Sequence, residues 1–166
     1  MANSTNLNKQ QHGLVLQQLT VTAATTLTTA DSGKTIIWTP ASGGGYHITL
    51  PKCQAGLNFK FLIKLGDNGF GNSITIGNTD DYFFGCVIVY DSNSENEEIT
   101  SQNVAYATDT LEFINVDSDS ATTGGTVGDV IYVEAIDANA WAVSAMLGTT
   151  GTLGTIATLA AATTSS

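Results

Sequence analysis

Short runs of apolar and β-branched residues, each followed by a turn signal, are the dominant pattern of this chain. Such runs, broken by Gly, Asn, Asp and Pro every ~8–20 residues, are typical of sandwich and barrel strands. The pattern predicts strands at residues 35–38, 46–51, 57–65, 73–76, 86–90, 111–116, 130–135 and 141–146, and no amphipathic helix. We therefore expect an all-β fold, with a single β-sandwich or jelly-roll-like domain over residues 27–147.

The clearest alternation of apolar and polar positions lies in residues 57–65. Phe59, Phe61 and Ile63 occupy alternate positions, and the residues between them are polar apart from Leu62. Because successive strand side chains point to opposite faces, this pattern predicts a half-buried strand. A Gly- and Asn-rich segment follows, and the alternation resumes at residues 73–76. We expect the two strands to form a β-hairpin with a loop longer than two residues.

The flanking and connecting segments have a different composition. Residues 1–26 begin with a polar, Asn- and Gln-rich stretch and are expected to form an extended N-terminal arm. Residues 91–103 and 117–126 are expected to be acidic, polar loops. Residues 148–166 are small, uncharged and low in complexity, and are expected to form a flexible C-terminal tail. We hypothesise that arm and tail extend onto neighbouring subunits and order only on assembly.

The charge balance excludes several classes of partner. The chain has 15 Asp and Glu but only 5 Lys and no Arg, for a formal net charge of −10. A nucleic-acid binder needs clustered cations, so no direct nucleic-acid contact is expected. No stretch of about 18 apolar residues exists, so no membrane partner is expected. The start lacks a basic region followed by an apolar run, so no signal peptide is expected either.

Few residues could support catalysis. The two histidines are His12, in the expected arm, and His47, in an expected strand that turns it toward solvent or an interface. The glycines of residues 43–45 lack the Lys-Ser/Thr ending of a phosphate-binding loop and are expected to form a turn. We therefore expect a protein that is not an enzyme and that binds no cofactor.

The acidic residues and the cysteines each leave an alternative open. Residues 117–120 begin like a calcium-binding loop, but the required glycine and terminal glutamate are misplaced. Solvated acidic loops are favoured over a metal site at residues 80–81, 95–98 and 117–119.

Cys53 and Cys86 each lie in or beside an expected strand. We expect both to be buried and reduced, with a disulfide between neighbouring strands as the alternative.

Several segments together resemble one group of proteins. The order of residues 27–35, 48–51 and 55–61, followed by Gly-Asp at 128–129 and Trp141, is similar to that in small structural proteins of tailed bacteriophages and related viruses. The resemblance covers about residues 27–65 and 128–146. It implies a capsid decoration (cement) protein with a β-sandwich or jelly-roll body, usually a homotrimer. Such a protein is made in the host cytoplasm and binds the major capsid protein on the outer surface of the virion.

Apolar residues in the arm, the tail and one aromatic triplet are candidates for the capsid or subunit interface. The three adjacent rings at residues 82–84 cannot all face inward from one strand. The candidates are Leu14, Val15, Leu16, Tyr82, Phe83, Phe84, Leu153, Ile156 and Leu159.

One alternative to capsid decoration is a trimeric tail-fibre or host-recognition module that binds surface glycans through exposed aromatics, although Trp38 and Trp141 are expected in the core. Another is a secreted carbohydrate-binding or hydrolytic β-sandwich.

Overall fold

The all-β prediction is confirmed by a computed structural model, which describes residues 17–39, 45, 47–64, 71–91, 99–106, 111–116, 124–149 and 158–161. These residues form strands, connecting turns and one short 3-10 helix, η1 (Thr29–Asp31). None of the helical structure in these ranges is long and apolar enough to cross a membrane.

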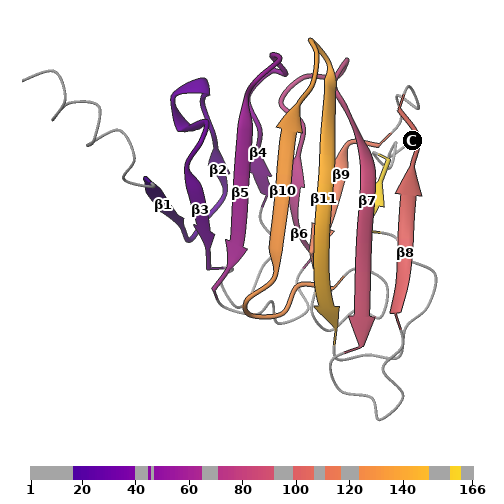
Figure 1. Ribbon diagram of the computed structural model, residues 1–166. Coiled ribbons are helices and arrows are strands. Elements are labelled where there is room, and N and C mark those ends of the chain that lie inside the picture. Colours follow the sequence, from indigo (N-terminus) through magenta and orange to yellow (C-terminus); the bar gives the residue numbers. More distant parts are fainter. Residues whose placement is uncertain are drawn as a thin grey trace, which may run out of the picture.

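The strands form two mixed sheets that lie as two layers (Figure 1). The seven-stranded sheet has the order β1 (Gln18–Val21), β3 (Thr35–Trp38), β5 (Asn58–Ile63), β10 (Val130–Ala135), β11 (Ala140–Thr149), β7 (Tyr82–Asp91), β8 (Ile99–Val104). The five-stranded sheet has the order β12 (Leu159–Ala160), β9 (Phe113–Val116), β6 (Asn72–Thr75), β4 (His47–Thr49), β2 (Thr25–Thr26).

A single hydrophobic core fills the space between the two sheets. The seven-stranded sheet contributes its large aromatic side chains, and the five-stranded sheet contributes aliphatic ones. Phe59 packs against Trp141 with ring centroids 6.0 Å apart, and Trp38 meets Phe61 edge-on at 6.5 Å. On the opposite layer, the register aligns Ile48, Ile74, Ile114 and Leu159 in one buried row across four strands.

The first six strands alternate between the sheets. Strands β1, β3 and β5 run parallel to one another in one sheet, and β2, β4 and β6 run parallel in the other. The chain therefore makes three successive turns around the core, in the manner of a parallel β-helix. Equivalent positions stack, so that Leu19, Ile36 and Phe61 are neighbours and Val21, Trp38 and Ile63 are neighbours.

The expected hairpin over residues 57–77 is wrong. Strand β5 pairs with β3 and β10, whereas β6 lies in the other sheet between β4 and β9. Most of the Gly- and Asn-rich segment between the two strands lies outside the described residues. Parallel pairs also link β7 to β11. The jelly-roll arrangement, which is built from antiparallel strands, is therefore not confirmed.

Parts of the expected arm, acidic loop and tail are strands. Residues 18–21 and 25–26 form β1 and β2, and Val21 is buried in the core. Strand β8 occupies residues 99–104, most of which were expected in a loop. Strand β11 continues to Thr149, and β12 pairs with β9. The edge strands of the two sheets are β1, β2, β8 and β12. An edge strand pairs on one side only, and polar and Thr-rich sequences can form such a strand.

Candidate interaction surface

The outer face of the seven-stranded sheet carries a continuous row of apolar side chains. The register places Ile37, Leu62, Val130, Met146 and Ile88 side by side on β3, β5, β10, β11 and β7. We call these five residues the apolar row. Met146, near its centre, is 59% exposed, and the other four are partly exposed. Because the solvent face of a sheet is ordinarily polar, this row is the most distinctive surface feature of the described residues.

The loop before β10 adds a further exposed apolar side chain beside the row. Val127 is 63% exposed and lies between two hollows. One hollow, of about 460 Å³, is also lined by Ile37, Leu62 and Lys64. The other, of about 500 Å³, is also lined by Tyr90, Val130 and Met146. Val127 therefore forms a projection with a concave, partly apolar surface on each side.

A buried carboxylate fixes this loop. Asp129 Oδ2 accepts hydrogen bonds from the backbone N–H groups of Thr126 and Gly148, each at 2.7 Å. Asp129 Oδ1 accepts a third bond from Thr126 Oγ1 at 3.3 Å. The Asp129 side chain thus ties the Val127 loop to the end of β11. Burial raises the pKa of Asp129 to about 6, although the backbone N–H donors act in the opposite direction.

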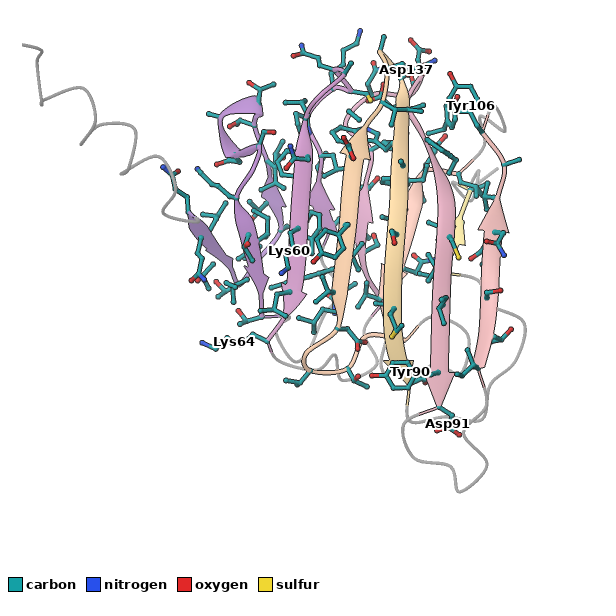
Figure 2. The ribbon with its side chains drawn as sticks, in the orientation of Figure 1. Lys60, Lys64, Tyr90, Asp91, Tyr106 and Asp137 are labelled. Atoms are coloured by element: carbon teal, nitrogen blue, oxygen red, sulfur yellow. The ribbon has the colours of Figure 1, made fainter. Side chains whose placement is uncertain are left out.

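Lys64 follows β5 and is exposed at one lower side of the sheet, and Asp91 ends β7 (Figure 2). Asp91 occupies the same alternate position of its strand as the buried Val87 and Val89 and is aligned with the buried Thr149, so it does not share the outer face with Ile88. The apolar row itself contains no charged residue. The lower half of this face is therefore apolar, with one positive charge at its side.

The upper half of the same face holds a third hollow of about 380 Å³. Tyr132, which is 52% exposed, contributes an aromatic ring to its wall. Lys60 Nζ lies over this ring, 5.5 Å from the centroid. Asn58, Glu134 and Ser144 add polar groups to the lining. An exposed ring beside hydrogen-bonding side chains is the chemistry that recognises a sugar, which has both C–H faces and hydroxyl groups.

A second cluster of polar and aromatic groups lies near the β10–β11 turn, at the upper right of the sheet in the view of Figure 2. Tyr106 donates its hydroxyl proton to Asp137 Oδ2 at 2.6 Å, and its ring meets Phe84 edge-on at 5.3 Å. Asp137 Oδ1 accepts from the backbone N–H groups of Asn139 and Ala140. The Tyr106 hydrogen bond lowers the pKa of Asp137, and the same bond raises that of Tyr106 to about 12. These contacts occupy both carboxylate oxygens and stabilise the turn.

The structure places four of the nine predicted interface residues. Phe83 is fully buried, Leu159 is 2% exposed and Tyr82 is 5% exposed, so these side chains belong to the protein's own core or its edge. Phe84 alone points outward among the four, and it packs on Tyr106. Leu14, Val15, Leu16, Leu153 and Ile156 lie outside the described residues. Sequence reasoning missed the apolar row because only the register brings its members together.

The residues considered for chemistry are scattered. Cys53 is buried as expected, whereas Cys86 is only partly buried, so the expectation that both are buried is wrong for Cys86; both are free cysteines. Burial, more than the nearby carboxylates, raises the pKa of Cys53 to about 12, so it remains a thiol. Asp81, a calcium candidate, instead accepts a hydrogen bond from Cys53 N at 2.8 Å.

Metal and histidine chemistry finds little support in the described ranges. There, no three His, Cys, Asp or Glu side chains gather in a way that could hold a metal ion. Asp117, Asp119 and the glutamates of residues 95–98 lie outside these ranges. His47 Nδ1 hydrogen-bonds Ser73 Oγ at 2.6 Å on the five-stranded sheet, and its ring packs edge-on against Phe113.

Comparison of the chain with family models, curated proteins and solved structures finds no match in any of the three. The surfaces described above are therefore the basis on which a function is proposed.

Proposed function

We propose that this chain is a non-enzymatic viral structural protein, a capsid decoration (cement) protein. In this proposal it acts as a homotrimer that binds the major capsid protein on the outer surface of the virion, after synthesis in the host cytoplasm. The observation that supports the proposal best is the exposed apolar row across five adjacent strands. Apolar side chains side by side on the outer face of a sheet are a feature of proteins that work in contact with other protein molecules. The order of sequence motifs over residues 27–65 and 128–146 adds the viral resemblance.

The proposed mechanism is multivalent binding. Each subunit would bury a modest area on the capsid, and a trimer would engage several capsid subunits at once. Because the binding sites of one trimer are linked, its overall affinity would exceed that of any single site. The shell would then resist internal pressure better than one interface alone would allow. The two-sheet body would have the role of the jelly-roll or sandwich body in the decoration proteins that the sequence resembles.

The test is to mix the purified protein with undecorated capsids of the virus whose genome encodes it. Co-sedimentation and cryo-electron microscopy would measure occupancy. We expect saturable binding at fixed lattice positions and greater resistance of the capsids to heat. Absence of binding at saturating protein concentration would contradict the proposal.

A tail-fibre or host-recognition module that binds surface glycans is the second candidate, and the Tyr132 hollow favours it. Three of the largest aromatic rings, Trp38, Phe83 and Trp141, are fully buried and cannot bind a glycan. Tyr132 and Lys60 offer an exposed alternative on the outer sheet face. Glycan-array binding that is lost in Tyr132→Ala but kept in Tyr106→Ala would favour this candidate over capsid decoration.

A further inference from the structure

We propose that the hollow beside Tyr132 binds a single acidic sugar, with Tyr132 contacting the C–H groups of the sugar and Lys60 binding its carboxylate. The inference goes beyond capsid decoration and does not require it. It rests on the glycan-binding candidate, which it deepens by naming the class of sugar. The ligand is small, because about 380 Å³ lies near the lower end of the ~300–1,000 Å³ range of ligand sites.

The hollow crosses strand β10 between Tyr132 and Glu134, which lie two positions apart and therefore point to the same face of the sheet. On β5, Lys60 lies opposite Tyr132, and Asn58 lies opposite Glu134. On β11, the short side chain of Ser144 lies opposite Tyr132. A ligand in the hollow thus meets an aromatic ring and a carboxylate on β10, a lysine and an amide on one side, and a hydroxyl on the other.

The Tyr132 ring supplies the apolar surface that a sugar needs. The side chain is 52% exposed and lines the hollow, so its ring can contact the C–H groups of a sugar. Lys60 Nζ lies 5.5 Å from the ring centroid. A sugar that contacts the ring therefore brings a carboxylate within reach of the Lys60 ammonium group.

The polar side chains of the hollow supply both donors and acceptors. Glu134 is exposed, and its carboxylate accepts hydrogen bonds. Asn58 Nδ2 donates to Gly56 O at 3.3 Å, which leaves Oδ1 of the same amide as an acceptor. The Ser144 hydroxyl both donates and accepts. Sugar hydroxyls also donate and accept, so they find matching groups around the Tyr132 ring.

The charge of Lys60 favours an acidic sugar over a neutral one. Within the part of the chain that the structure describes, Lys34 pairs with Asp31 at 2.7 Å, whereas Lys60 forms no ion pair, even with Glu134 in the same hollow. A partly buried ammonium group without a carboxylate partner favours an anionic ligand, whose oxygens accept charge-assisted hydrogen bonds. The net charge of −10 repels anions elsewhere, which disfavours a long acidic polymer and favours one acidic sugar.

The first experiment measures the binding of two matched probes to the full chain by isothermal titration calorimetry. One probe is an oligosaccharide that ends in glucuronic acid, and the other is the same molecule with that carboxyl group reduced to an alcohol. At about 0.15 M ionic strength, distant charges are screened over a Debye length of ~8 Å. We expect the acidic probe to bind about fivefold more tightly than the reduced one.

The second experiment separates the ring from the charge. Tyr132→Ala should weaken the binding of both probes at least about tenfold, whereas Tyr132→Phe should keep most of the affinity. Lys60→Met keeps an apolar stem but removes the ammonium group, so the preference for the acidic probe should disappear. Lys64→Met is the matched control, because Lys64 follows the same strand but lies outside the hollow, and it should preserve the preference. Circular dichroism of every variant confirms folding.

The results distinguish failure of this inference from failure of the glycan-binding candidate. A Lys60→Met variant that retains the preference for the acidic probe overturns the inference. Equal affinities of the wild type for the two probes, both weakened by Tyr132→Ala, overturn the inference but leave glycan binding at the hollow standing. Absence of binding to both probes, and to every sugar of a glycan array, overturns both. Capsid decoration is tested separately by co-sedimentation with capsids.

Discussion

The Asp129 carboxyl group makes the free energy of unfolding depend on pH. Burial raises its pKa from 3.8 to about 6, so the folded state holds this proton more tightly than the unfolded chain does. Between these two values the folded state binds more protons, and stability falls as the pH rises. The contribution of Asp129 is therefore fully present below about pH 4 and is lost as the pH passes 6.

Substitution Asp129→Asn isolates this effect, because the amide keeps an acceptor for the loop but does not titrate. We expect the free energy of unfolding of the wild type, relative to the variant, to decrease from about pH 4 to pH 6. Urea denaturation across this range measures it. Comparison with the variant removes the opposite trend of Asp31, whose pKa the Lys34 hydrogen bond lowers to about 2. A relative stability that rises over the same interval would contradict the assignment.

Gly85 is required by a close approach of two backbones. Its φ is 127°, and a Cβ atom there would overlap the main chain of Val143 on the neighbouring strand β11. Gly85→Ala should therefore lower the free energy of unfolding by at least about 3 kcal/mol. Gly33→Ala is the matched control, since Gly33 also has a positive φ, 80°, but no atom lies within 4 Å of the added carbon. Its cost should be about 1 kcal/mol, and equal costs for both would contradict the overlap.

At the scale of elements, one side chain links an edge strand of each sheet. Gln102 on β8 donates from Nε2 to Leu159 O at 2.8 Å and accepts from Leu159 N on Oε1 at 2.9 Å. The amide thus substitutes for a strand partner of β12. Gln102→Ala should lower the free energy of unfolding by about 1–2 kcal/mol, measured by urea denaturation. Asn103→Ala, at the next exposed position of β8, is the control and should change it by less than about 0.5 kcal/mol. An equal effect of both would contradict the link.

Strand positions could be predicted from the sequence far better than strand partners. The alternation in residues 58–63 arises from local geometry, and β5 lies where it was expected. The partners of β5 depend on contacts between distant segments, such as Phe61 with Ile36 and Ile131, which no local pattern encodes. The edge strands β1, β2, β8 and β12 were missed because their sequences are polar or small.

The candidate surface had one signal in the sequence. Leu62 interrupts the polar side of its strand, and it proves to be a member of the apolar row. Val130 and Met146 each lie at an outer position of their strands, but neither stands out in its own segment. The row exists only because the register brings five single positions together. The predicted interface residues Phe83 and Leu159 are instead core, because large apolar residues in strands most often face inward.

At the scale of the whole molecule, the net charge of −10 predicts how salt affects self-association. A chain of this length has a diameter of about 40 Å, and two such charges at that distance repel by roughly 10 kcal/mol in unscreened water. An exposed ion pair between two copies would contribute only about 0–1 kcal/mol. Repulsion therefore dominates, and salt screens it.

We expect the dissociation constant of the proposed trimer to decrease as ionic strength rises from about 0.01 M to about 0.15 M, where the Debye length shortens from ~30 to ~8 Å. Sedimentation equilibrium at both salt concentrations measures this change. A variant that carries both Lys64→Glu and Asp91→Lys is the control, because its net charge equals that of the wild type and its salt dependence should match. Tighter association at the lower salt concentration would mean that complementary charge, rather than apolar contact against a general repulsion, holds the copies together.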